Sequence, residues 1–194
     1  WCNSTGNQLI SKEATGGKSV VVIEKGEPKS CNIVTSCEGK GKTFIMFSDD
    51  LDKALATFVL ANGAAATGQK VTIFFTFWGL NVIKKLHKPN VEKDIFGKMF
   101  GMMLPSSSRK LKLSKMSMGG IGGKMMRYIM NRKGIDSLES LRQQALENGV
   151  EFIACQMSMD VMGVKQEELL DEVTIGGVAT YMERADNANI NLFI

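Results

Sequence analysis

The sequence predicts an α/β fold in which a mostly parallel sheet carries helices on both faces, with a short β-hairpin at the amino end. Short, continuous apolar runs end in polar clusters, which is the pattern of buried parallel strands. These runs alternate with helical patterns, and that alternation indicates βαβ units. Hydrophobic residues make up 44% of the chain and charged residues 23%, as in a globular protein.

The amino end contains two extended segments separated by two glycines. LISKEA precedes Gly16-Gly17 and SVVVIEK follows them, which predicts a β-hairpin. Because two strands cannot bury a core alone, we expect residues 1–27 to be a remnant of another domain, with a cut end before Trp1. The polar segment at 28–41 is expected to be a linker.

One larger domain is predicted over residues 42–194. Its apolar segments predict strands near 43–47, 70–76, 151–155 and 190–194, with VTIGG as a further short extended piece. A parallel arrangement of these strands brings their carboxyl ends to one edge of the sheet, where ligands and chemistry are found in such folds.

Helices are expected between these strands. The first is predicted from Leu51 to about Ala66, with Asp49 or Asp50 as its cap. Ser137 is the expected cap of a later helix that places Glu139 on an exposed face. The remaining helices are expected from Asn81 and over 124–134, 138–149, 164–172 and 178–188.

A basic insertion at about 84–133 separates the two halves of the domain. It carries thirteen Lys and Arg residues against two acidic residues, and it holds eight of the thirteen Met residues. Such a segment suits an acidic partner or an anionic membrane surface. Nucleic acid is disfavoured because the aromatic residues that stack on bases are not interleaved with the cations. No apolar run is long enough to predict a membrane span.

Four cysteines do not form a disulfide scaffold in a chain of this size, so reduced thiols and a cytoplasmic location are expected. Cys155 ends a strand just ahead of a helix. Partial exposure and a helix start would both favour its thiolate, although a small buried hydrophobic role is equally compatible with the spacing. Cys31 and Cys37 lie in the linker at neither a CxxC nor a zinc spacing, and Cys2 is too close to the chain start to interpret.

Three strand ends supply the other candidate residues of a site around Cys155. The predicted binding residues are Ser48, Asp49, Thr76, Trp78, Gly79 and Ser158. The run Asp160, Glu167, Glu168, Asp171 and Glu172 is expected to be a solvated acidic helix face.

No metal or cofactor site is predicted. His87 is the only histidine, which removes multi-histidine zinc sites from consideration. GGIGGK at 119–124 lacks the flanking Gly and Ser/Thr of a Walker motif, since those positions hold Met118 and Met125. It is interpreted as a flexible hinge.

Two blocks of the chain carry a specific pattern: the carboxyl block EFIACQMSMDVMG, which reads AC-x-MSMD-x-MG, and the earlier block KTFIMFSDDLDKALATFVLANGAAATGQKVTIFFTFWGL. These blocks resemble the DsrE/DsrF/DsrH-like (DsrEFH-like) proteins, the first the cysteine pattern of one branch and the second the first βαβ unit of that branch. The resemblance covers roughly 40–194 and includes the MGGIGGKMM insertion. It implies a flavodoxin-like sheet, a homo-oligomer, and a cysteine at position 155 that accepts sulfane sulfur as a persulfide.

The amino-terminal piece WCNSTGNQLISKEATGGKSVVVIEKG resembles the tail of TusA/SirA-like sulfur carriers. The CPxP motif that carries sulfur in those proteins does not occur in this chain. The resemblance therefore implies a fusion to part of a carrier domain, with TusA-like or rhodanese-like proteins as partners.

The leading functional hypothesis is a sulfur carrier or sulfurtransferase that takes sulfur onto Cys155 and passes it to a partner thiol. Whether turnover is catalytic stays open. The alternative is a non-enzymatic module that docks a partner or a membrane through the 84–133 insertion, with Cys155 buried and inert. A peroxidase-like thiol is a third hypothesis, weakened because nothing marks a resolving cysteine near Cys155.

Overall fold

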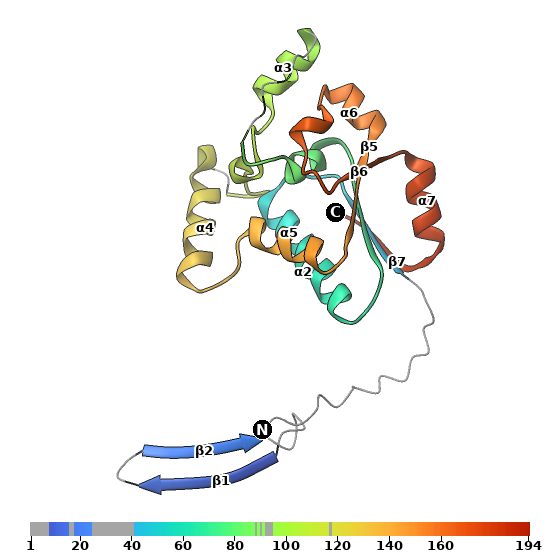
Figure 1. The fold of residues 1–194 in the computed structure, drawn as a ribbon. Coiled ribbons are helices and arrows are strands. Elements are labelled where there is room, and N and C mark those ends of the chain that lie inside the picture. The colour runs from blue at the N-terminus through green and yellow to red at the C-terminus, as the bar shows by residue number, and fades with distance from the viewer. Residues whose placement is uncertain are drawn as a thin grey trace. The chain divides into compact units, whose positions relative to one another are not determined.

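The computed structural model describes residues 8–15, 18–24, 41–87, 89, 91, 95–116 and 118–194. The chain divides into two compact units, Trp1–Glu38 and Gly39–Ile194, each of which is described by itself. In the first unit, β1 (Gln8–Thr15) and β2 (Lys18–Glu24) pair antiparallel, so the predicted β-hairpin is confirmed (Figure 1). The predicted linker at 28–41 lies outside the described residues, except for its last residue.

The second unit is built on a five-stranded sheet with the order β6-β5-β4-β3-β7 (Figure 1). All neighbouring strands pair parallel, which confirms the predicted α/β fold. Every residue of the central strand β4 is buried, as expected for a strand whose other residues are apolar and whose Thr72 hydroxyl is bonded to Glu151. The strands are β3 (Gly41–Met46), β4 (Val71–Phe75), β5 (Glu151–Cys155), β6 (Thr174–Gly176) and β7 (Ala188–Phe193).

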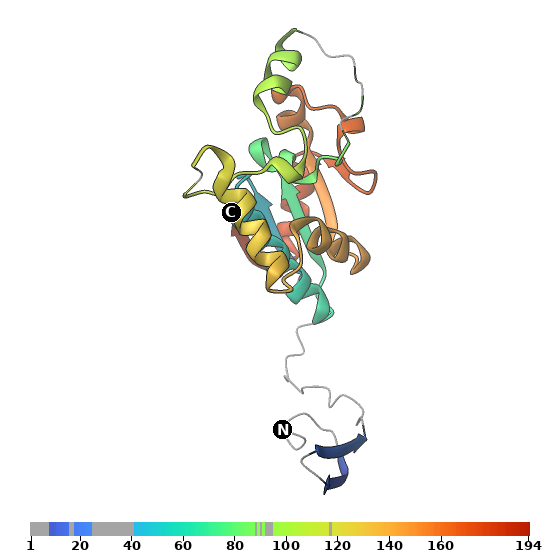
Figure 2. The same ribbon diagram turned by 90° about the vertical axis from the view of Figure 1, so that its left-hand side faces the viewer.

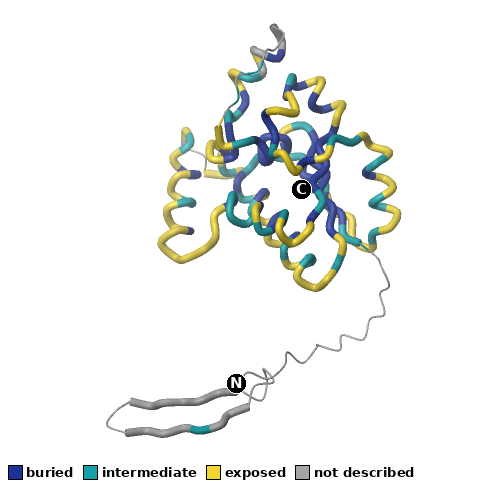
Figure 3. The backbone as a smooth tube through the Cα atoms, in the orientation of Figure 1, coloured by how far each residue is buried: buried dark blue, intermediate teal, exposed yellow. Residues whose placement is uncertain are grey.

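Helices cover both faces of this sheet. On one face, α2 (Leu51–Ala66) and α5 (Leu138–Glu147) pack beside each other over the larger core. There the ring of Phe58 lies 5.7 Å from that of Phe152. On the other face, α7 (Val178–Asp186) places Tyr181 5.1 Å from the ring of Phe74. Figure 3 shows the buried residues concentrated on the strands between these helices.

The carboxyl edge of the sheet carries short helices. These are η1 (Phe77–Ile83), a 3₁₀ helix, α6 (Gln156–Met162), and the single turn η4 (Gln166–Glu168). The helix expected from Asn81 therefore begins earlier, at Phe77. The helix expected over 164–172 is wrong, because the backbone of this segment bonds to the chain near Lys84 instead. Leu170 N–H donates to Ile83 O at 3.1 Å, and Lys85 N–H donates to Glu168 O at 2.9 Å.

The basic insertion contains α3 (Ile95–Met103), the turns η2 (Ser108–Lys110) and η3 (Met118–Gly120), and α4 (Ile121–Arg132) (Figure 2). The hinge expected at 119–124 is wrong from residue 121 onward, because α4 begins at Ile121. Gly119 and Gly120 are left-handed, but Gly122 lies inside α4, where a Cβ atom would overlap the carbonyl of Met116. Close packing of the helix start on the preceding loop explains the glycine at this position.

Candidate functional site

Cys155 is the last residue of β5 and occupies the N-cap position of α6, as the sequence predicted. Its thiol is free, but the residue is only 1% exposed. The partial exposure expected for it is therefore not found. Strand alternation turns Cys155 and Ile153 toward the face covered by α7, where they pack with Phe74 and Tyr181, while Ala154 faces the larger core.

Two predicted binding residues meet beside this strand–helix junction. The hydroxyl oxygen atoms of Thr76 and Ser158 lie 2.8 Å apart, and Ser158 is fully buried. Thr76 follows β4, and Ser158 lies in the first turn of α6, three residues after Cys155. The hydrogen bond therefore fixes the start of α6 against the end of the central strand.

The turn after β4 has an unusual backbone. Phe77 has a φ of 46°, a left-handed conformation that is uncommon for a bulky residue. Two residues later, Gly79 donates its N–H to Phe47 O at 2.9 Å, and a Cβ atom there would overlap the carbonyl of Met46. Gly79 thus has a packing role that brings η1 directly onto the end of β3.

Asp49 follows β3 and is held by an amide that the sequence argument did not single out. Asn81 is fully buried in η1 and donates from Nδ2 to Oδ2 of Asp49 at 3.0 Å. Burial raises the pKa of Asp49 above its ordinary value, and this effect outweighs the hydrogen bond from Asn81, which lowers the pKa. Asp49 therefore binds a proton more readily than an ordinary aspartate does.

The neighbouring residues Ser48 and Asp50 are engaged with each other. Ser48 Oγ donates to Asp50 Oδ2 at 2.8 Å, and Lys53 Nζ lies 2.8 Å from the same oxygen. Asp50 is the N-cap residue of α2, but its side chain accepts no capping hydrogen bond. Asp50 thus takes the expected N-cap position of α2. It does not form a capping hydrogen bond, and Ser48 and Lys53 bind its carboxylate oxygen Oδ2 instead.

Trp78 lies at the mouth of a pocket that it shares with Asp49. The pocket has a volume of about 490 Å³, and Trp78 is 43% exposed there. The remaining wall comes from the end of α3 and the segment after it, including Met102, Lys110 and Lys112. Cys155 is not part of this wall. Five of the six predicted binding residues divide between the pocket, the buried hydroxyl pair and the structural turn, and the sixth, Ser48, bonds to Asp50.

A family model of the DsrE/DsrF/DrsH-like family matches residues 39–193, which is nearly all of the second unit. The chain belongs to this family. The resemblance inferred from the AC-x-MSMD-x-MG block is thereby confirmed at the level of the family, whereas the TusA-like origin of the amino-terminal hairpin stays a prediction.

Two relatives of this DsrE-like chain match nearly their whole length. The Bacillus subtilis protein named "Uncharacterized protein YrkE" is 44% identical over 155 residues, covering 80% of this chain and 97% of the relative. The "Sulfur carrier protein DsrE2" of Allochromatium vinosum is 38% identical over 161 residues, covering 81% and 99%. The crystal structure of the E. coli ychN protein aligns with a TM-score of 0.48 at 9% identity, over 80% of this chain and 99% of that one.

The structure also places the other candidate residues. His87 is exposed, as are Asp160, Glu167, Asp171 and Glu172, whereas Glu168 is buried. Cys2, Cys31 and Cys37 lie outside the described residues. Among the residues that the structure describes, no group of His, Cys, Asp and Glu could hold a metal ion, and no helix is long and apolar enough to cross a membrane.

Sequence reasoning missed the buried polar residues that support the carboxyl edge. Arg142 of α5 is buried and donates from Nη1 to Val82 O at 2.8 Å. Lys84 is also buried and donates from Nζ to Pro105 O at 3.2 Å. In the sequence, the one sign of these buried polar residues is that Asn81 and Lys84 flank the apolar pair Val82-Ile83.

Proposed function

We propose that this protein is a sulfur carrier in a sulfur relay, taking sulfane sulfur onto Cys155 as a persulfide and passing it to a partner thiol. The observation that supports the proposal most is the position of a free cysteine at the end of a parallel strand and the start of a helix, in a chain of the DsrE family. The 38% identity to a protein named as a sulfur carrier points the same way.

The proposed uptake step is a thiolate substitution. The Cys155 thiolate attacks the outer sulfur of a donor persulfide, the donor S–S bond breaks, and the electron pair leaves on the inner donor sulfur, which takes up a proton. Delivery is the same step in reverse order: an acceptor thiolate attacks the outer sulfur on Cys155, and Cys155 leaves as a thiolate. Neither step needs an external oxidant or reductant.

Burial of Cys155 adds a requirement to this mechanism. With 1% of the residue exposed, a donor can reach Sγ only if the packing around the β5–α6 junction, including that of Phe74 and Tyr181, opens. The first turn of α6 exposes Met157 and Gln156 at its surface, so a protein partner could contact the junction directly. We therefore expect protein donors and acceptors of the TusA-like or rhodanese-like kind, a homo-oligomeric assembly, and a cytoplasmic setting.

One observation favours the docking module as a second candidate. In the basic insertion, Met102 is 86% exposed and Met103 is 77% exposed, next to Lys110 and Lys112 on the same pocket. Exposed thioethers beside cations suit an acidic protein surface or a peripheral contact with an anionic membrane. This function requires no chemistry at Cys155.

Sulfur loading separates the two candidates. The reduced, natively folded chain is incubated with inorganic polysulfide or thiosulfate, and the modified residue is located by mass spectrometry. Added sulfur is expected mainly on Cys155, and Cys155→Ser should lose most of it. Matched variants Cys31→Ser and Cys37→Ser should retain it. Sulfur on Cys31 or Cys37 with Cys155 unmodified would refute the carrier mechanism and leave the docking module.

A further inference from the structure

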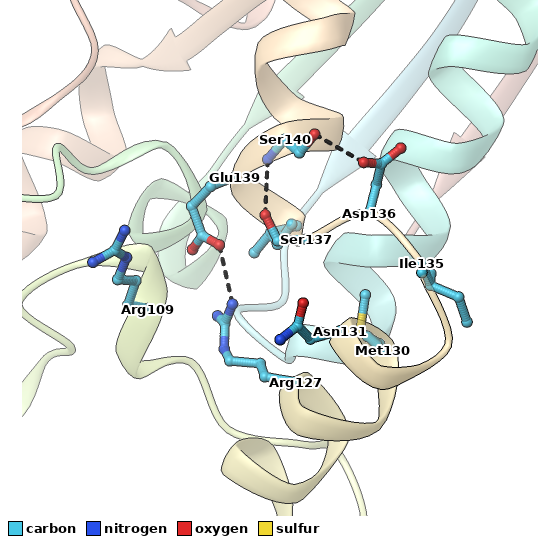
Figure 4. A pocket seen from close by; sticks show the side chains of 11 residues that line it. Arg109, Arg127, Met130, Asn131, Ile135, Asp136, Ser137, Glu139 and Ser140 are labelled. Atoms are coloured by element: carbon cyan, nitrogen blue, oxygen red, sulfur yellow. Dashed lines mark hydrogen bonds and ion pairs between the residues drawn. The ribbon is translucent and has the colours of Figure 1, made fainter.

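A second pocket lies between α4 and the start of α5, and Cys155 is not among the residues that line it (Figure 4). Its volume is about 710 Å³. Arg109 comes from η2, Arg127 and Asn131 from α4, and Asp136 and Glu139 from the segment around the start of α5. Ile135 is half exposed at its wall, beside the buried residues Met130 and Leu138.

The acidic groups of this pocket already have partners on every carboxylate oxygen. Glu139 accepts from Ser108 Oγ at 2.9 Å and from Arg127 Nη1 at 3.1 Å. Asp136 accepts from Ser140 Oγ and from Gln144 Nε2, each at 3.1 Å. In Figure 4, Asp136 is directed toward Ser140. These carboxylates therefore contribute little unmet hydrogen-bonding capacity to the cavity.

The N–H donors of the pocket, in contrast, are not all paired with acceptors. Within the described part of the chain, the guanidinium of Arg109 and the side-chain amide of Asn131 have no hydrogen bond or ion pair, and both residues are exposed. Arg127 Nε is buried and also lacks an acceptor among the described residues. Arg109 and Asn131 thus offer the cavity N–H donors without acceptors, whereas the buried Arg127 Nε is out of reach of a ligand, and the first turn of α5 adds partial positive charge.

We propose that this pocket binds a small organic anion. The acid group, which offers only acceptor oxygens when ionised, would bind the Asn131 amide and the guanidinium of Arg109, which pairs with no described carboxylate, unlike Arg127. The apolar body would lie on Ile135 and the adjoining edge of Met130. A volume of about 710 Å³ lies in the range of small-molecule sites and exceeds what a single inorganic ion fills.

This inference does not depend on sulfur transfer at Cys155. The pocket wall contains no cysteine, and Cys155 packs with Phe74 and Tyr181 on the face of the sheet opposite to α5. A Cys155→Ser chain should therefore bind the anion as the wild type does, so the two proposals can fail separately.

The test uses naphthalene-2-sulfonate as the probe and the neutral naphthalene-2-sulfonamide as its matched control. Titration calorimetry on the full chain at low salt should show the sulfonate binding at least about tenfold more tightly, because only it carries the charge that Arg109 recognises. In ¹⁵N-labelled protein, the Asn131 side-chain amide and the backbone amides of Gly134 and Ile135 should shift. Equal affinity for the two compounds, or no binding of the sulfonate, overturns the proposal.

Two variants locate the site. Arg109→Gln removes an exposed cation with no described partner, so the fold should be kept while sulfonate affinity falls by about tenfold. Lys110→Gln removes the same charge from the next residue, which lines the Asp49–Trp78 pocket instead. It should leave the affinity unchanged. A similar loss in both variants would mean that the sulfonate senses only the general positive charge of the insertion, and would overturn the assignment.

Discussion

The hydroxyl groups of Thr76 and Ser158 form a buried hydrogen bond of 2.8 Å between the end of β4 and the first turn of α6. Because α6 begins at the residue after Cys155, this contact fixes the helix start that adjoins the thiol. Neither residue is exposed enough for water to replace the lost partner without rearrangement, since Ser158 is fully buried and Thr76 is 9% exposed.

Removing one hydroxyl should loosen the junction. Ser158→Ala leaves the Thr76 hydroxyl unpartnered, and we expect the free energy of unfolding to fall by about 1–3 kcal/mol in urea titrations. The rate at which an aromatic disulfide reagent labels Cys155 should rise in a background where Cys2, Cys31 and Cys37 are serine. Unchanged labelling despite lower stability would show that the hydrogen bond does not control access.

The double variant Thr76→Val/Ser158→Ala gives the matched control. It removes both polar groups, so no unmet hydroxyl stays buried, and its destabilisation should be smaller than the sum of the two single effects. Strict additivity would mean that the two hydroxyls do not interact in the folded protein.

Gly79→Ala should be strongly destabilising because the added Cβ would overlap the Met46 carbonyl. Relieving the overlap requires backbone movement of η1 or β3, and we expect a loss of at least about 2–3 kcal/mol, or failure to fold. Gly63→Ala is the control: it adds the same methyl group to α2 with nothing within 4 Å. That variant should be neutral or more stable by up to about 1 kcal/mol in thermal and urea unfolding. Equal effects would contradict the packing argument.

Glu139 should make stability depend on pH. Burial alone would raise the pKa of Glu139, but the Arg127 charge and the Ser108 hydrogen bond outweigh burial and hold the pKa below its ordinary value. Its contribution is therefore fully present above the unfolded pKa of about 4.3 and is lost as the pH falls through the lower folded-state pKa. At neutral pH, Glu139→Gln should cost about 1–3 kcal/mol.

Urea titrations between about pH 3 and 7 would check this, and the difference between wild type and Glu139→Gln should shrink as the pH falls below the ordinary carboxyl value. Glu147→Gln changes the same residue type at an exposed position of the same helix. Its unfolding midpoint should match the wild type at every pH. A constant gap for Glu139→Gln across the range would exclude titration of Glu139 as the cause.

The strands could be predicted because each is specified by its own residues. The apolar run in VTIFF can be satisfied only by burial on both faces, and β4 is the central strand for that reason. The short segment VTIGG also becomes a strand, β6, at the edge of the sheet. The Ser137 cap was equally predictable, since its hydroxyl accepts from the Ser140 N–H in the expected way.

Contacts between distant segments could not be predicted in this way. Glu139 was expected on an exposed face because its helix is polar on that side. In the structure Arg127, twelve residues away in another helix, pairs with it and shields it from solvent. The helix expected over 164–172 failed for a similar reason, since backbone bonds to the chain near Lys84 replace helical ones. Tertiary partners overrode local propensity in both cases.

The sequence predicted where the site lies, but it did not predict how the residues of the site are arranged. Successive residues of a strand point to opposite faces of the sheet, so Cys155 and Ala154 lie on different faces, and a shift of one residue would exchange them. The sequence identifies the end of β5 without specifying that face. Asp49 and Trp78 therefore share a pocket of which Cys155 is not a part.

The enclosure of Cys155 has a consequence for the lifetime of any sulfur it holds. Small thiols outside the protein would strip a persulfide at a rate scaled down by the fraction of time that the β5–α6 junction is open. A docked acceptor that stabilises the open junction would react without this reduction in rate, since its binding shifts the population toward the reactive state. The packing around Cys155 would then act as a kinetic filter, in which loss to small thiols and delivery to the acceptor differ by access to one sulfur atom instead of by its intrinsic reactivity.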